Sequence, residues 1–347
     1  MWPRRSTQRF PYSFLRLNEF SPAALLVLLI FAGGFYIVRE LRIPHVEKGW
    51  VLGTYITISI EGPQARPAAR AAWKEIKRVE QLAYRWNYYN GLNLLNRRQT
   101  AQLSDPDIFT MVSTAQNYWR LSGGYLDITL LPLEQLWDFE RKQVPSDQKI
   151  KGVLPAVGMQ HVSTDPKQQS IAFMHPATEI DLSAITTGYA LDRAREQLLR
   201  FKITYASINA GDVIVTVGHP ILQLKWTFQL KYPWEPGFVT PVPVKLKSNQ
   251  ALAFVHDRQT YFKDSQGEVF HNILNPFTGY PIHSGYRGVL IVSDSAFTAN
   301  CLALAVFGAG KPLPADNGSK VRYIVIQGDS AAELKILELK PSYAPTR

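Results

Sequence analysis

The order of helical and extended patterns along the chain restricts its fold more than any other feature. Near the beginning, Ala68, Ala72, Ile76 and Val79 recur on one face of a segment that follows Pro67, which is the spacing of a helix. From residue 170 onward, apolar runs of strand length alternate with only a few helices. Early helices and late strands are typical of an α+β protein rather than of a regular βαβ array.

The same patterns predict individual elements. The expected helices cover about residues 67–83, 106–121, 193–201 and 296–307. The expected strands cover residues 50–60, 170–174, 203–209, 213–217, 226–231, 250–254, 287–293 and 321–327. Residues 141–150 are polar and contain a proline, so we expect a surface loop there.

Cysteine content and charge limit how the chain can be stabilised and what it can bind. The chain contains 1 cysteine, Cys301, which excludes an internal disulfide and leaves the hydrophobic core to hold the fold. The formal net charge is +10, but the basic residues form no dense run with interleaved aromatics. We therefore expect no nucleic acid partner.

An uncharged apolar segment lies near the N-terminus, at residues 21–38. It is close to the length that crosses the hydrocarbon core of a bilayer, and arginines lie on both sides of it. No small-x-small cleavage site follows it. We predict an uncleaved signal anchor, with residues 1–20 in the cytoplasm and the main domain, residues 49–340, outside. A cleaved signal peptide and a buried core helix are the alternatives.

Polar motifs recur through the main domain in a characteristic order. Residues 122–137 read SGGYLDITLLPLEQLW and residues 181–192 read DLSAITTGYALD. Residues 271–281 read HNILNPFTGYP, and residues 295–307 read SAFTANCLALAVF. Together these motifs resemble the ApbE-like family, the FAD:protein FMN transferases. The resemblance implies a single T-fold-related domain, and it makes the predicted membrane the bacterial inner membrane with this domain in the periplasm.

The resemblance also implies roles for individual residues. It implies that FAD, as a substrate, is bound by Asp127, Thr129, Asp181, Thr187, Gly188, Asp192, Asn209, Gly211, Thr278 and Gly279. It implies catalytic roles for Asp257 and His271 and a Mg²⁺ site that uses Thr186 and Asn300. A turn into a helix, such as residues 181–192, suits a diphosphate because the first backbone N–H groups of a helix attract anions.

Several family positions hold different residues in this chain. The family lysine is Thr187, and the aspartate and threonine that bind the metal are Asn300 and Leu304. Mg²⁺ prefers hard, anionic oxygen ligands, so we expect weak metal binding at best. His256 and its two predecessors replace a Thr-Ser-Gly run, which adds bulk near the candidate site.

Two hypotheses about function follow. In the first, the chain transfers FMN from FAD to a threonine or serine of a target redox protein and releases AMP. In the second, it is a catalytically inactive binding or assembly module of a membrane redox complex. Both imply the same partner, a flavin-accepting membrane or periplasmic redox protein.

Overall fold

The computed structural model describes residues 26–27, 29–31, 33, 44–102, 105–218, 225–235, 238–315, 320–328 and 333–339. The chain divides into two units, residues 1–43 and residues 44–347. The described residues of the first unit are helical and exposed. Most of the predicted anchor lies outside the described residues, so it stays a prediction. Among the residues that are described, no helix combines the length and the apolar content needed to cross a bilayer.

An antiparallel sheet of 8 strands organises the second unit, with the strand order β1-β2-β6-β7-β10-β13-β14-β15. Every pair of neighbouring strands in it is antiparallel. The strands are β1 (His45–Val51), β2 (Thr54–Ile60), β6 (Ala206–Ala210), β7 (Val213–Val217), β10 (Ala251–His256), β13 (Gly288–Ser293), β14 (Arg322–Gln327) and β15 (Lys335–Leu339).

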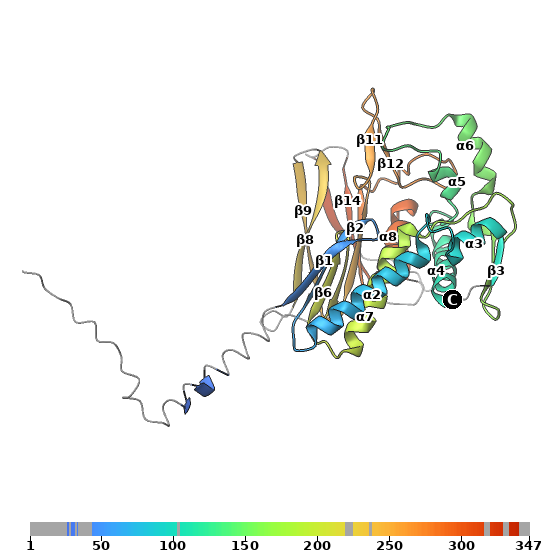
Figure 1. Ribbon diagram of the computed structural model, residues 1–347. Coiled ribbons are helices and arrows are strands. Elements are labelled where there is room, and N and C mark those ends of the chain that lie inside the picture. The colour runs from blue at the N-terminus through green and yellow to red at the C-terminus, as the bar shows by residue number, and fades with distance from the viewer. Residues whose placement is uncertain are drawn as a thin grey trace, which may run out of the picture. The chain divides into compact units, whose positions relative to one another are not determined.

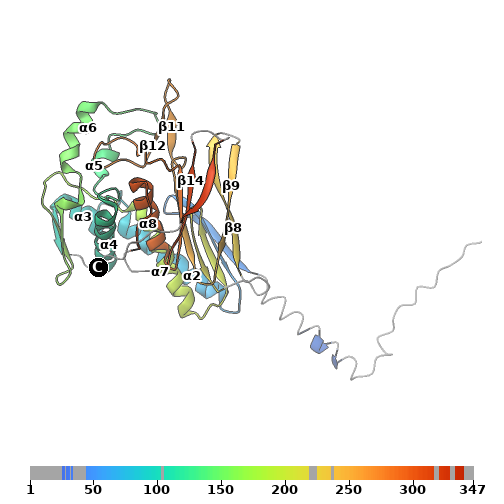
Figure 2. The same ribbon diagram turned by 180° about the vertical axis from the view of Figure 1, so that it is seen from behind.

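Both faces of this sheet are covered, as Figures 1 and 2 show from opposite sides. Successive side chains of a strand point to opposite faces, and β10 illustrates the result. Ala251 and Ala253 join the core beneath the helices, whereas Leu252 and Phe254 join a second core beneath a two-stranded hairpin. The helices are α2 (Ala65–Ala83), α4 (Pro106–Ser122), α7 (Ser183–Arg200) and α8 (Ala296–Ala309), and the hairpin is β8 (Trp226–Glu235) with β9 (Phe238–Leu246).

Smaller elements surround the helical layer. A third apolar cluster joins α5 (Leu131–Glu134), α6 (Asp147–Val153), β11 (Tyr261–Lys263) and β12 (Val269–His271). It includes Leu133, Trp137, Ile150, Phe262 and Phe270. The remaining elements are α3 (Gly91–Arg98), β3 (Thr100–Gln102), β4 (Val162–Asp165), β5 (Ser170–Phe173) and two 3₁₀ turns, Leu154–Ala156 and Met159–His161. The expected mixture of sheets and helices is confirmed.

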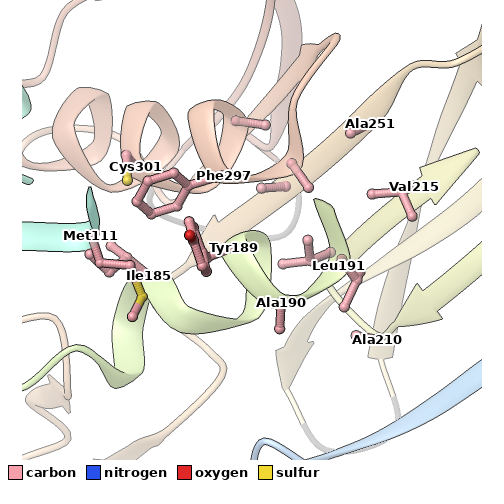
Figure 3. Close-up of a cluster of buried hydrophobic side chains, with 14 of the residues drawn as sticks. Met111, Ile185, Tyr189, Ala190, Leu191, Ala210, Val215, Ala251, Phe297 and Cys301 are labelled. Carbon is pink, nitrogen blue, oxygen red and sulfur yellow. The ribbon is translucent and has the colours of Figure 1, made fainter. Parts of the chain in front are cut away.

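Helices α7 and α8 pack on the same face of the sheet and contact each other, and Figure 3 shows two sides of α7. Leu191 lies toward the strands, on the side of Val215. Tyr189 lies toward α8, where its ring meets Phe297 edge to face with the ring centroids 5.1 Å apart. The Tyr189 hydroxyl also donates a hydrogen bond to Asp107 Oδ1 of α4 at 2.6 Å, so α7 is held from three directions.

Four expectations about elements differ from the structure. The helix expected at residues 193–201 is α7, which already begins at Ser183 and ends at Arg200. Residues 50–60, expected to form one strand, contain the turn between β1 and β2, where Leu52 and Gly53 have φ values of 56° and 68°. The expected loop at residues 141–150 includes the start of α6. Strand β9 was missed because Pro241 and Pro243 argue against a strand. They are tolerated because β9 pairs only with β8 and needs few of its own N–H groups.

Gly188 supplies a test of the contact between α7 and α8. A Cβ at this position would lie 2.6 Å from the Ala296 carbonyl oxygen and 2.8 Å from Asn300 Cβ. Gly188→Ala should therefore lower the free energy of unfolding by about 1–3 kcal/mol, measured by urea denaturation. Gly152→Ala is the matched control in α6, because its Cβ would meet nothing within 4 Å. Gly152→Ala should raise the free energy of unfolding by about 0.5–1 kcal/mol. Equal changes in the free energy of unfolding for the two variants would contradict the close contact between α7 and α8.

Candidate functional site

The backbone that leads into α7 is fixed by Asn96 of α3. Its Nδ2 donates a hydrogen bond to the Ile180 carbonyl oxygen at 2.9 Å, and its Oδ1 accepts one from the Ile180 N–H at 2.9 Å. This pair of bonds is buried. Asn96 therefore sets the position of the first turn of α7. The sequence motifs gave no role to Asn96, because its partner is 84 residues away.

A group of three charged side chains lies beside this turn. Asp181 is 4% exposed, and its Oδ1 accepts a hydrogen bond from the Ser183 N–H at 2.6 Å. Its Oδ2 accepts one from Arg85 Nη1 at 3.2 Å. Arg85 Nη1 also lies 3.3 Å from Glu134 Oε2 at the end of α5. Neither Arg85 nor Glu134 was recognised from the sequence: Arg85 belongs to no motif, and Glu134 lies within residues 122–137 at a position to which the motif assigns no role.

Glu134 is the group beside the turn whose charge depends on pH near neutrality. Burial, and after it repulsion by Asp181, raise the pKa of Glu134, Arg85 opposes both, and the net pKa is about 7. The side chain keeps 31% of its surface exposed, so solvent moderates the energetic effect.

The crossing of α7 and α8 brings together the two predicted metal residues. Asn300 Nδ2 donates a hydrogen bond to the Ala184 carbonyl oxygen at 3.1 Å, and its Oδ1 accepts one from the Gly188 N–H at 3.2 Å. Thr186 lies on the intervening turn of α7, where its hydroxyl donates to the Leu182 carbonyl oxygen at 2.6 Å. Thr187 follows it and is half-buried.

Asp192, for which FAD binding stays a prediction, joins α7 to the beginning of α8 through both of its carboxylate oxygens. It accepts hydrogen bonds from the Ser295 hydroxyl at 2.6 Å, the Ala296 N–H at 3.0 Å and the Phe297 N–H at 2.9 Å. Arg195 Nη2 lies 2.9 Å from its Oδ1. A carboxylate at this position satisfies the first N–H groups of α8 and suits the positive end of the helix dipole.

Asp127 and Thr129 hold a neighbouring loop. Asp127 Oδ1 accepts hydrogen bonds from the Thr129 N–H at 2.7 Å and hydroxyl at 2.5 Å, and its Oδ2 accepts one from the Met159 N–H at 3.1 Å. Thr129 Oγ1 accepts one from the Gly158 N–H at 2.6 Å. Burial raises the pKa of Asp127 to about 6. These contacts give Asp127 and Thr129 a structural role, because they tie the loop after α4 to the turn at residues 158–159.

The two residues predicted to be catalytic are buried and hydrogen-bonded. His271 Nδ1 accepts a hydrogen bond from the Ile273 N–H at 3.3 Å, and Nε2 lies 3.1 Å from the Ile282 carbonyl oxygen, to which it donates. Burial lowers the pKa of His271 to about 4, so the ring is neutral near pH 7. Asp257 accepts from the Tyr232 hydroxyl at 2.8 Å and from Arg287 Nη1 at 3.2 Å. A catalytic role for either residue stays a prediction.

The remaining predicted residues lie in two turns. Asn209 Oδ1 accepts a hydrogen bond from the Gly211 N–H at 2.9 Å, and Gly211 has a φ of 73° between β6 and β7. Gly279 has a φ of 75°, and its carbonyl oxygen accepts from Trp137 Nε1 at 3.0 Å. Thr278 is exposed beside it. Contact with a flavin stays a prediction for these residues.

The residues at the α7–α8 crossing do not fit a Mg²⁺ ion. Both amide atoms of Asn300 are engaged with α7, and Leu304 packs against the core. Asp192, the nearest acidic side chain described on α7, is committed to the beginning of α8. Within the described parts of the chain, no group of three His, Cys, Asp or Glu residues could hold a metal ion.

The raised pKa of Glu134 gives a prediction about stability. Its folded-state pKa of about 7 exceeds the ordinary value of 4.5, so the folded state holds the extra proton between these values. The free energy of unfolding should therefore fall as the pH rises through this window. Glu134→Gln should be more stable than wild type by about 1 kcal/mol at pH 8, and the difference should vanish near pH 4.

The measurement is urea denaturation at both pH values. Glu140→Gln, which changes an exposed glutamate of the same region, is the control. It should shift the free energy of unfolding equally at pH 4 and pH 8. A Glu134→Gln effect that does not depend on pH would show that Glu134 is not a buried, repelled carboxylate.

Three comparisons place the chain among known proteins. The family model described as "ApbE family" matches residues 52–315. A protein of Klebsiella pneumoniae named FAD:protein FMN transferase is 26% identical over 215 residues, which are 61% of this chain and 65% of that protein. One of the same name from Escherichia coli K12 is 24% identical over 300 residues, 82% of this chain and 85% of that protein.

A solved structure agrees with these matches. The ApbE protein of Thermotoga maritima superposes with a TM-score of 0.70 at 27% sequence identity. The superposition covers 81% of this chain and 94% of that protein.

Proposed function

The chain belongs to the ApbE family, and we propose that it transfers FMN from FAD to a threonine or serine hydroxyl of a target protein, releasing AMP. Family membership confirms the resemblance drawn from the sequence motifs. The activity is carried over from relatives named FAD:protein FMN transferase. The observation that supports it most is the turn before α7, whose backbone is held in place by the side chains of Asn96 and Asp181.

That turn combines an exposed helix terminus with a fixed backbone. Ser183 and Ala184 begin the 18-residue helix α7 and are exposed, although the Ser183 N–H already donates to Asp181 Oδ1. Asn96 and Asp181 hold the preceding backbone in place. A helix N-terminus of this kind attracts a diphosphate through its N–H groups and its dipole.

The proposed reaction is phosphoryl transfer with a simple balance of bonds. The acceptor hydroxyl oxygen bonds to the phosphorus of the FMN half, and the bond from that phosphorus to the bridging oxygen breaks. AMP leaves with the electron pair, and the hydroxyl proton passes to solvent or to a nearby base. Such a reaction depends on positioning and on neutralising charge. In this chain the α7 terminus would position the diphosphate, and Arg85, one-third exposed beside Asp181, is a cation at the same turn.

Thr187 gives a test of where the diphosphate binds. Thr187→Lys adds a positive charge one turn into α7 and should tighten FAD binding about tenfold. Thr187→Glu is the matched variant of opposite charge and should weaken binding by a similar factor. Flavin fluorescence titration at low salt measures both. Equal affinities of the two variants would place the diphosphate away from α7.

The activity itself is tested by transfer of flavin to protein. The purified chain is incubated with FAD and with a protein domain that accepts FMN on a threonine, and covalent flavin is read on a denaturing gel and by mass. A family member known to label the same domain is the positive control. A labelled acceptor is the expected result. No label from this chain beside a labelled control would favour the binding or assembly module.

We further propose that residues 21–38 anchor the chain in the bacterial inner membrane with the second unit in the periplasm. The support is the uncharged apolar run with flanking arginines. The acceptor would then be a membrane or periplasmic redox protein. Protease digestion of intact spheroplasts tests this orientation. The protease should degrade the second unit if that unit is periplasmic. A second unit that survives digestion would be cytoplasmic and would contradict the proposal.

A further inference from the structure

Asn300 forms an unusual pair of contacts with a single turn of α7. In an α-helix, the N–H of residue 188 is the ordinary partner of the carbonyl of residue 184. Asn300 reaches both members of this pair from α8, donating to the Ala184 oxygen at 3.1 Å and accepting from the Gly188 N–H at 3.2 Å. The amide therefore joins the two helices through both of its polar atoms.

Gly188 makes this crosslink possible. The absence of a side chain there lets the backbone of α8 approach so closely that a Cβ would lie 2.6 Å from the Ala296 oxygen. Asn300 is 5% exposed, so its amide is shielded from water and needs both partners. The short side chain of asparagine spans the gap only because the helices are this close.

An aspartate at position 300 could not make the same contacts. One carboxylate oxygen could still accept from the Gly188 N–H. The other would face the Ala184 carbonyl oxygen, where Asn300 now donates a hydrogen. Two oxygen acceptors at hydrogen-bonding distance repel unless a proton or a cation lies between them. The amide NH₂ of Asn300 thus places a positively polarised hydrogen against the Ala184 carbonyl oxygen, where a carboxylate would need a bound cation to offset the repulsion.

We infer that Asn300 is a positioning residue whose amide replaces a divalent cation at the α7–α8 crossing. The chain consequently binds its flavin dinucleotide without a cation at this crossing. This inference deepens the proposed function and rests on it only for the identity of the ligand. The crosslink itself, and its independence of metal, can be tested on the protein alone.

The neighbouring side chains leave no second set of metal ligands at the crossing. Leu304, one turn further along α8, packs against the core and offers no oxygen. The Thr186 hydroxyl donates back to the Leu182 carbonyl oxygen at 2.6 Å. Asp181 is paired with Arg85 at 3.2 Å, which lowers its value as a cation ligand.

The experiment compares thermal unfolding of the full chain in EDTA and in 10 mM MgCl₂. Wild type should unfold at the same temperature in both, within about 1 °C. Asn300→Asp should lower Tm by about 5 °C in EDTA, and Mg²⁺ should restore at least about half of this loss. Asn300→Ala, which removes both bonds and leaves no carboxylate, should lower Tm in both solutions alike.

Two results would overturn the inference. A stabilisation of wild type by Mg²⁺ of more than about 3 °C would show that a cation site exists beside the amide. An Asn300→Asp protein that folds but ignores Mg²⁺ would show that the amide does not occupy a cation position.

Calorimetry keeps the inference testable if Asn300→Asp does not fold. Mg²⁺ titrated into the wild-type chain should give no saturable heat, and one site per chain would contradict the inference. FAD affinity in EDTA and in MgCl₂ should differ by less than about twofold. If the chain binds no FAD at all, the proposed function fails while the unfolding and Mg²⁺ titration results still decide the role of Asn300.

Discussion

The close crossing of α7 and α8 at Gly188 is the contact on which the rest of the site depends. The α8 backbone lies so near that even a methyl group would collide with the Ala296 carbonyl. This approach brings Asn300 within reach of α7 and lets Asp192 satisfy the first N–H groups of α8. Because both helices pack on the same sheet face, their crossing also fixes where α7 begins relative to the strands.

Many polar residues of the family motifs have a structural role in this chain. Asp192, Asp127 and Thr129 use their oxygens to hold backbone N–H groups of other segments. Buried backbone groups must find such partners, since leaving one unpaired costs about as much as a lost hydrogen bond. The fold therefore gives these residues a role that does not depend on a bound ligand or metal.

The charges beside the α7 turn differ from those that the motifs alone indicate. Thr187, where the motif resemblance implies a lysine, is neutral, but Arg85 lies beside the same turn and contacts both Asp181 and Glu134. A guanidinium shared by two carboxylates is partly neutralised, so protonation of Glu134 changes how much positive charge Arg85 presents. The electrostatics of the turn therefore depend on Arg85, which belongs to none of the recognised motifs, and on Glu134, to which the motifs assign no role.

The periodic elements and the glycine that ends α4 could be predicted from the sequence, because they follow from local rules. The apolar face of α2, the end of α4 at Gly123 with a φ of 68°, and the alternating strands all follow from neighbouring residues. Local rules failed at the β1–β2 turn and at β9, where a hairpin partner decided the outcome.

The contacts between polar groups that are distant in sequence depend on the tertiary structure. Asn96 and Ile180 are 84 residues apart, Arg85 and Asp181 are 96 apart, and Asn300 meets Ala184 across 116 residues. A motif can say that an asparagine has replaced an aspartate, but not that its amide finds a carbonyl and an N–H on one helical turn. That depends on helix separation, which is set by packing of the whole core and is not encoded in any short segment.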